Sequence, residues 1–234
     1  MEQRQFIVID IETKPADNWR DFVKDFDVEE VKIGNLKDQS KIDAKIKQAM
    51  AIYWATAEKN AALSALTGEV VIIAIYDSRD NAVTILEGDE STIINQFWDI
   101  VLRAVADNMD IVGHNIDGFD IPFLTQRSWI KNIIPVATRQ GRYLKSYFKD
   151  TMLIFLNYAY GKWTSLNDLA KVLGVGAKIV ENSKNFYKLY ERDRDKAIAH
   201  ATNDVIINAN VWRRLSQTRS DTSAINIDAF LETE

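Results

Sequence analysis

Four acidic residues from distant parts of the chain lie at or just beyond apolar segments. They are Asp10, Glu12, Asp120 and Asp204. A carboxylate beside buried apolar residues is costly unless it is paired or binds a metal ion. These four residues therefore predict one metal site that the fold assembles from separate elements. Because the acidic ligands all bind through oxygen, the expected cations are Mg²⁺ or Mn²⁺.

Asp10 and Glu12 form the first motif, within FIVIDIETKP. Side chains two residues apart on a strand point to the same face of the sheet. Two carboxylates this close repel each other unless a cation lies between them. The alternative is a strand end that turns into solvent with both acids hydrated, so this motif alone is weak evidence of a site.

Asp120 and Asp204 are both expected on helices. Asp120 follows a Gly-His-Asn turn and falls on the first turn of a helix, where it could equally be an ordinary N-terminal charge. Asp204 falls inside the last helix, with His200 four residues earlier on the same face. An ordinary histidine pKa of about 6.5 suits a general base. The alternative for His200 is a helix-face histidine without a role.

Hydrophobic periodicity predicts the elements that would position these residues. Strands are expected over 5–11, 70–76, 82–86 and 110–113. Helices are expected over 40–66, 91–106, about 118–130, 151–160, 165–173, 186–190 and 193–215. This order is typical of a mixed α/β domain. We expect one domain at residues 1–220, with a long helical excursion at about 38–66 and a polar C-terminal tail at 221–234.

The composition excludes several classes of protein. The chain has 234 residues, 47% of them hydrophobic and 27% charged, which is ordinary for a soluble globular protein. It has no apolar run of about 18 residues, so no membrane span is expected. Zero cysteines exclude disulfides and thiolate metal sites, and two histidines argue against a histidine-rich zinc site. The lack of cysteine and of a signal-peptide pattern favours a cytoplasmic location.

The charge distribution points to one candidate phosphate-binding surface. The net charge of −5 argues against a general nucleic-acid coat, but residues 121–149 contain basic side chains and no Asp or Glu. The basic side chains are Arg127, Lys131, Arg139, Arg142, Lys145 and Lys149. Arg127, Arg142 and Lys145 are the candidate substrate contacts, and the alternative is a solvated basic face. Aromatic residues in the same stretch could stack on bases or belong to the core. They are Trp129, Tyr143, Tyr147 and Phe148.

The motifs together resemble the DEDD group of 3′–5′ exonucleases. Three motifs match the pattern of this group. They are D-x-E on the first strand, N-x-x-x-F-D in the middle of the chain, and an acid one turn after an aromatic residue on a late helix. IVGHNIDGFDIPFL is especially similar to the proofreading domain of family B DNA polymerases and to related stand-alone exonucleases, some of them phage-borne. The resemblance covers about residues 5–215. It implies a ribonuclease H-like fold, with a mixed sheet of antiparallel and parallel strands flanked by helices. It also implies a protein of the cytoplasm of a bacterial, archaeal or phage-infected cell.

The resemblance also implies a two-metal mechanism with assigned ligands. Asp10 would bridge two Mg²⁺ or Mn²⁺ ions. Glu12 and Asp204 would complete the site of the ion that activates water. Asp120 would serve the second ion. The implied activity is hydrolysis from the 3′ end of single-stranded nucleic acid, with DNA favoured over RNA.

His200 departs from the pattern of the DEDD group. That group carries either a tyrosine four residues before the last Asp or a histidine five residues before it. Here His200 stands at the tyrosine's spacing, and Ala199 occupies the position five before Asp204. The resemblance still implies that His200 orients or deprotonates the attacking water.

The resemblance further implies weaker assignments and leaves alternatives open. Asn115 and Phe119 would lie near the terminal nucleotides, and Thr13 near the 3′ end. The alternatives are an exoribonuclease of the same superfamily, a catalytically weak module that binds nucleic acid or a partner, and a structural domain without a site. The presence of all four carboxylates disfavours a decayed module. The oligomeric state and the role of residues 38–66 stay open.

Overall fold

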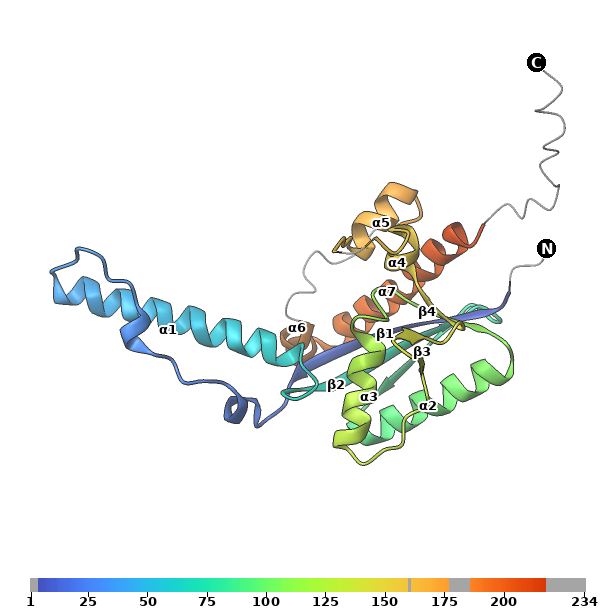
Figure 1. The fold of residues 1–234 in the computed structure, drawn as a ribbon, viewed down its shortest axis with the longest axis horizontal. Coiled ribbons are helices and arrows are strands. Elements are labelled where there is room, and N and C mark those ends of the chain that lie inside the picture. The colour runs from blue at the N-terminus through green and yellow to red at the C-terminus, as the bar shows by residue number, and fades with distance from the viewer. Residues whose placement is uncertain (1–3, 160, 177–185, 218–234) are drawn as a thin grey trace, which may run out of the picture.

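A five-stranded mixed sheet is the centre of the computed structural model, which describes residues 4–159, 161–176 and 186–217 (Figure 1). The strand order is β3-β2-β1-β4-β7. The antiparallel strands are β1 (Phe6–Pro15), β2 (Gly68–Asp77) and β3 (Ala82–Glu87). The strands parallel to β1 are β4 (Asp110–Gly113) and β7 (Phe148–Asp150). A separate two-stranded sheet joins β5 (Arg139–Gln140) to β6 (Tyr143–Leu144). The predicted combination of antiparallel and parallel strands is confirmed.

Helices cover both faces of the sheet because side chains alternate along the buried strands. One face packs against α2 (Glu90–Ala106) and α3 (Asp120–Ile130), and its β1 residues are Ile7, Ile9 and Ile11. The other face packs against α7 (Arg194–Leu215), and its β1 residues are Phe6 and Val8. Figure 1 shows α7 on one side of the sheet and the green α2 and α3 on the other.

Three of the predicted helix starts are confirmed by side-chain caps. Asp89 accepts a hydrogen bond from the backbone of α2, Ser165 caps α5 (Leu166–Leu173), and Asp193 caps α7. Each cap satisfies a backbone N–H that has no partner inside its helix. The short α6 (Phe186–Arg192) precedes α7.

The helix predicted over 151–160 is wrong in length. α4 spans only Thr151–Phe155, and the chain then turns through Asn157 and Tyr158. Both of these residues have positive φ angles, 50° and 56°, which interrupt a right-handed helix. The apolar composition that suggested a longer helix therefore belongs partly to a turn.

An extended arm replaces the turn between β1 and β2. Pro15 at the end of β1 lies opposite Gly68 at the start of β2, so residues 16–67 form an insertion into a β-hairpin. Residues 16–62 of this insertion are here called the arm. The arm holds two single-turn 3₁₀ helices, Trp19–Phe22 and Val28–Glu30, followed by the long helix α1 (Gln39–Ala62). Figure 1 shows this segment, in blue and cyan, projecting away from the sheet.

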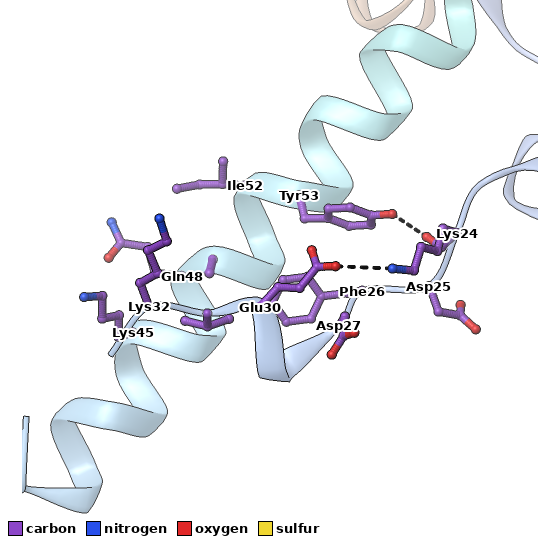
Figure 2. Close-up of a pocket in the computed structure, with 12 residues that line it drawn as sticks. Lys24, Asp25, Phe26, Asp27, Glu30, Lys32, Lys45, Gln48, Ile52 and Tyr53 are labelled. Atoms are coloured by element: carbon purple, nitrogen blue, oxygen red, sulfur yellow. Dashed lines mark hydrogen bonds and ion pairs between the residues drawn. The ribbon is translucent and has the colours of Figure 1, made fainter. Parts of the chain in front are cut away.

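Aromatic side chains within the arm pack against one another. The ring of Tyr53 on α1 lies 5.5 Å from the ring of Phe26 and 5.2 Å from that of Trp54. A cavity of about 730 Å³ lies between α1 and residues 24–32, and its lining mixes apolar side chains with Lys24, which pairs with Glu30 (Figure 2). This hollow belongs to the arm and not to the carboxylates on β1.

Two further expectations from the sequence concern a membrane-spanning helix and the C-terminal tail. Within the part of the chain that the structure describes, no helix combines the length and apolar character needed to cross a membrane. The polar tail predicted at 221–234 lies outside the described residues.

Candidate metal centre

β1 aims Asp10 and Glu12 toward α7. Both have the same strand parity as Phe6 and Val8, which pack against α7, and both are half-buried. The buried neighbour Ile11 points to the opposite face. The sequence prediction that the two carboxylates share a face is therefore consistent with the packing of β1. A bulge between Glu12 and Thr13 ends this regular stretch of the strand.

α7 brings His200 and Asp204 to the same face of the sheet. The small residues Ala197 and Ala201 are fully buried against the sheet, which lets the helix approach β1 closely. His200 and Asp204 are only 2% and 4% exposed. Nε2 of His200 lies 3.7 Å from Oδ2 of Asp204, as the spacing of four residues on a helix predicts.

Asp120 is tied directly to the strand that carries the first two acids. Its Oδ1 accepts a hydrogen bond of 3.1 Å from the backbone N–H of Ile11. β4 pairs with β1 only as far as Val8, so Ile11 lies beyond the parallel ladder and Asp120 supplies its partner. The carboxylate of Asp120 therefore lies beside β1, past the end of its pairing with β4, and ligands usually bind at this end of parallel strands.

The electrostatics of Asp120 indicate a charge that needs compensation. Burial raises the pKa of Asp120 well above its usual value, and the nearby negative charge of Asp10 raises it further. Hydrogen bonds from the backbone N–H groups of Ile11 and of Asp120 itself oppose this rise. A cation beside the two carboxylates would stabilise their ionised forms.

Asp150 holds the loop between β4 and α3. This role was not predicted from the sequence. Its two carboxylate oxygens accept hydrogen bonds of 3.1 Å each from the backbone N–H groups of Asn115 and Asp117. The same side chain caps α4 through Met152 and Leu153. Asp150 is 5% exposed and its charge also raises the pKa of Asp120. An Asp directly before an apolar helix is a typical N-cap, which is the signal that could have revealed it.

A second set of hydrogen bonds joins this loop to α7. The hydroxyl of Thr151 lies 3.1 Å from Nδ1 of His114 and 2.9 Å from Oδ1 of Asn208. Nε2 of His114 lies 3.0 Å from the carbonyl oxygen of Thr164, so this nitrogen donates. Asn208 is one helical turn after Asp204. These contacts therefore hold the helix that carries Asp204 against the loop that precedes Asp120.

The three residues expected near the end of a substrate all have structural contacts. The hydroxyl of Thr13 donates a 2.6 Å hydrogen bond to the carbonyl of Ala62 at the end of α1. Asn115 has a positive φ of 61°, and a Cβ at Gly118 would come within 2.4 Å of its Oδ1. Phe119 packs against Phe123 with ring centroids 5.5 Å apart. These contacts position the loop, and substrate contacts of the three stay predictions.

The structure corrects the expectation for Arg127. Its side chain is 6% exposed and forms two hydrogen bonds, of 2.8 and 2.6 Å, with the carboxylate of Glu90. A third bond of 2.9 Å goes to the carbonyl of Ala65. A guanidinium bound in this way connects α3, α2 and the turn before β2. We therefore replace its expected phosphate contact with a structural role.

The rest of the basic stretch is partly neutralised by acidic neighbours. Lys131 lies 3.1 Å from Glu90, and Arg139 lies 3.0 Å from Asp117. Arg142 is exposed, and its guanidinium carbon lies 5.0 Å from the centre of the Tyr143 ring, which is 62% exposed. Lys145 on the same hairpin is half-buried. Of the aromatic residues, Trp129 is exposed while Phe148 belongs to the core.

The side chains of the centre fit divalent cations. Glu12, His200 and Asp204 each offer one ligand atom, and these atoms lie within 4.8 Å of one another. Asp10 and Asp120 form a neighbouring pair whose mutual repulsion contributes to the raised pKa of Asp120. Carboxylate oxygens are the ligands that Mg²⁺ and Mn²⁺ prefer, so the set can hold the cations that the sequence predicted.

Comparison with protein families identifies a match over most of the chain. Residues 62–233 match the family described as "Predicted 3'-5' exonuclease related to the exonuclease domain of PolB". Asp120, His200 and Asp204 lie within the matched range, whereas Asp10 and Glu12 precede it. No curated protein is similar enough to the chain to count as a match.

Comparison with solved structures supports the same fold. The chain is similar to the family B DNA polymerase from the hyperthermophilic archaeon Pyrobaculum calidifontis, with a TM-score of 0.57 and 18% sequence identity. The similarity covers 91% of this chain and 24% of the polymerase chain. At this identity the likeness concerns the fold alone. Together with the strand order, it confirms the predicted ribonuclease H-like α/β fold.

Proposed function

Because the chain belongs to the family of predicted 3′–5′ exonucleases related to the exonuclease domain of PolB, we propose that it hydrolyses single-stranded DNA from the 3′ end with two divalent cations. The observation that carries this proposal is the presence of two groups of acidic side chains, each of which includes a residue of β1. Asp10 interacts with the buried Asp120, and Glu12 lies with Asp204 in a set of ligand atoms within 4.8 Å. The β1 residues of the two groups, Asp10 and Glu12, are two positions apart on the strand.

The roles of the four carboxylates follow from their neighbours. Asp10 interacts with Asp120 and stands two residues before Glu12 on β1, so it would contribute to both ions. Glu12 and Asp204 would hold the ion beside α7, and Asp120 would hold the second ion beside β1. Bound Mg²⁺ or Mn²⁺ would supply activation of the attacking water and stabilisation of the leaving oxygen's charge. The loop bonds of Asp150 would keep Asp120 in place during this reaction.

The β5–β6 hairpin is the proposed contact for the single strand. Arg139 links this hairpin to the loop before Asp120 through Asp117. Arg142 and Lys145 would neutralise phosphates, and the exposed ring of Tyr143 beside Arg142 offers a surface for base stacking. Basic side chains combined with aromatic rings are typical of single-strand binding without strong sequence preference. This proposal narrows the candidate phosphate-binding surface expected over residues 121–149 to the hairpin.

The decisive experiment follows the degradation of 5′-labelled single-stranded DNA and RNA, with and without EDTA. The proposal expects a ladder that shortens from the 3′ end of DNA, needs Mg²⁺ or Mn²⁺ and disappears in Asp10→Ala and Asp120→Ala. Asp43→Ala, an exposed change on the arm, serves as the matched control and should keep the activity. Faster degradation of RNA would identify an exoribonuclease. Binding of DNA without degradation would instead identify a catalytically weak module.

A further inference from the structure

His200 is buried within the metal centre on α7. Its side chain is 1% exposed, and its ring lies 6.0 Å from the ring of Phe186, which covers it from α6. Nε2 faces Oδ2 of Asp204 at 3.7 Å. The chain has two histidines, and the other, His114, is bonded to Thr151 and Thr164 in the loop network. The two histidines therefore occupy different chemical settings.

The ligand atoms of Glu12, His200 and Asp204 have spacings close to those around one ion. An ion with ligand bonds of about 2.1 Å holds adjacent ligand atoms about 3 Å apart and opposite ones about 4 Å apart. The three atoms of this set lie within 4.8 Å of one another. Side-chain adjustments of about 1 Å would therefore bring all three to a common ion. Glu12 comes from β1, whereas the other two residues come from one turn of α7.

We propose that His200 binds the ion held by Glu12 and Asp204 directly, and that its nitrogen makes this site prefer Mn²⁺ to Mg²⁺. Mg²⁺ favours oxygen ligands in near-ideal octahedral geometry, whereas imidazole is a common ligand of softer divalent metals. The inference rests on the proposed function, since both require an ion beside α7. It also changes the role predicted from the sequence, because a nitrogen bound to a metal cannot accept the proton of the attacking water.

The test is a spectroscopic measurement on the whole chain. Mn²⁺ bound through imidazole has a magnetic coupling to the ¹⁴N nucleus that electron spin echo modulation detects. The measurement uses Mn²⁺ alone and Mn²⁺ with thymidine 5′-monophosphate, whose phosphate adds oxygen ligands. We expect the ¹⁴N coupling in the wild type and in His114→Gln, the matched control, and its loss in His200→Gln. His200→Gln should weaken Mn²⁺ binding about tenfold or more, the size of change typical of altered metal sites.

Each outcome supports or overturns the inference. In His200→Gln, Mg²⁺ affinity should change less than about threefold, since oxygen ligands dominate Mg²⁺ binding. Absence of ¹⁴N coupling from the wild type under both conditions, or its persistence in His200→Gln, would overturn direct binding. Equal weakening of both metals would overturn the preference for Mn²⁺. Nuclease activity without ¹⁴N coupling leaves the proposed function intact, whereas coupling without nuclease activity contradicts the proposed function alone.

Discussion

The helices α1 and α7 have nearly the same length but opposite relations to the rest of the molecule. α1 spans 24 residues, of which only Ala61 and Ala62 are buried. α7 spans 22 residues, and its buried set includes His200, Asp204 and the alanines that pack on the sheet. Helical pattern alone therefore does not distinguish the helix that carries candidate metal ligands. The two helices differ in their position against the sheet, and the packing of α7 fixes the side chains of His200 and Asp204.

The two helices also differ in what stabilises them. The side chain of Asp38 caps α1 by accepting from Ser40 and Lys41, and the helix is rich in alanine, which has the highest intrinsic helix propensity. α7 depends on tertiary contacts with β1, β2 and the loop network. The sheet and the helices packed on it are here called the body. The comparison predicts that equivalent substitutions in the arm and in the body have very different effects on activity and stability.

The largest contrast is expected for acidic residues. Asp120→Asn should reduce the nuclease rate more than about 1,000-fold, equivalent to roughly 4 kcal/mol, because it removes a charge that holds a cation in the proposed mechanism. Asp43→Asn on α1 should leave the rate unchanged, since its carboxylate only accepts a hydrogen bond from Gln39 at the surface. Single-turnover kinetics with saturating Mg²⁺ or Mn²⁺ would measure both variants. A rate for Asp120→Asn close to that of the wild type would remove Asp120 from the site.

The same substitution should increase the stability of the metal-free protein. Burial and then Asp10 raise the pKa of Asp120 in the folded state, so the ionised carboxylate destabilises the fold at pH values above its unfolded pKa. Asparagine removes this charge and can still accept the bond from Ile11. Thermal unfolding in EDTA near neutral pH should give a higher midpoint for Asp120→Asn than for the wild type. A lower midpoint would show that the carboxylate is well compensated without metal.

The second contrast compares two ion pairs. Arg127→Met removes a buried partner of Glu90 and should cost about 3 kcal/mol, because a buried charge loses its main compensation. Lys24→Met in the arm removes an exposed partner of Glu30 and should leave the unfolding midpoint unchanged. Chemical denaturation would measure both. Similar effects of the two substitutions would contradict the difference between arm and body.

The pH dependence of the buried pair has a defined sign. Burial raises the pKa of Glu90, but hydrogen bonds from Arg127 and from the backbone of Val70 outweigh it and lower the pKa below its ordinary value of 4.5. A depressed carboxyl pKa stabilises the fold above pH 4.5 and loses this effect as the pH falls. The stability difference between the wild type and Glu90→Gln should therefore be largest near neutral pH and shrink in acid. A difference that is constant with pH would exclude this linkage.

A smaller contrast is expected for alanines on the two helices. Ala209 on α7 is fully buried, so Ala209→Leu should overpack the core and cost about 1–3 kcal/mol. Ala51 on α1 is exposed, so Ala51→Leu should change stability by less than about 0.5 kcal/mol. Both substitutions add the same atoms to a helix of similar length. Equal costs in denaturant titrations would mean that α1 has a packing partner in solution.

The smallest effect is expected from removing most of the arm. Replacement of residues 18–59 by a short Gly/Ser linker should leave the body folded, because Pro15 still pairs with Gly68 and Ala16 still donates to the carbonyl of Thr67. The unfolding midpoint of the body should shift by only a few degrees, about 1 kcal/mol or less. Circular dichroism and thermal unfolding would measure the outcome. Failure of the shortened chain to fold would make the arm part of the core.

Much of the site could be predicted because its information is local. The alternation in FIVIDIE predicts that Asp10 and Glu12 share a face, and the spacing of His200 and Asp204 predicts that they meet on a helix. The predicted starts of α2, α5 and α7 agree with the observed starts to within one or two positions. The strand β7 was missed because three residues that include Lys149 have no readable alternation. Asp150 at its end was missed with it.

By itself the sequence determined most of the local elements, the pairs of chemical groups on β1 and on α7, and the resemblance to a metal-dependent exonuclease. The tertiary structure alone decided that Asp120 bonds to Ile11, that Glu12 meets His200, and that Arg127 belongs to the core and not to a nucleic-acid surface. The physical reason is the range of the interactions. Helix and strand periodicity act within a few residues, whereas these contacts join segments that are far apart along the chain and depend on the path of the whole fold.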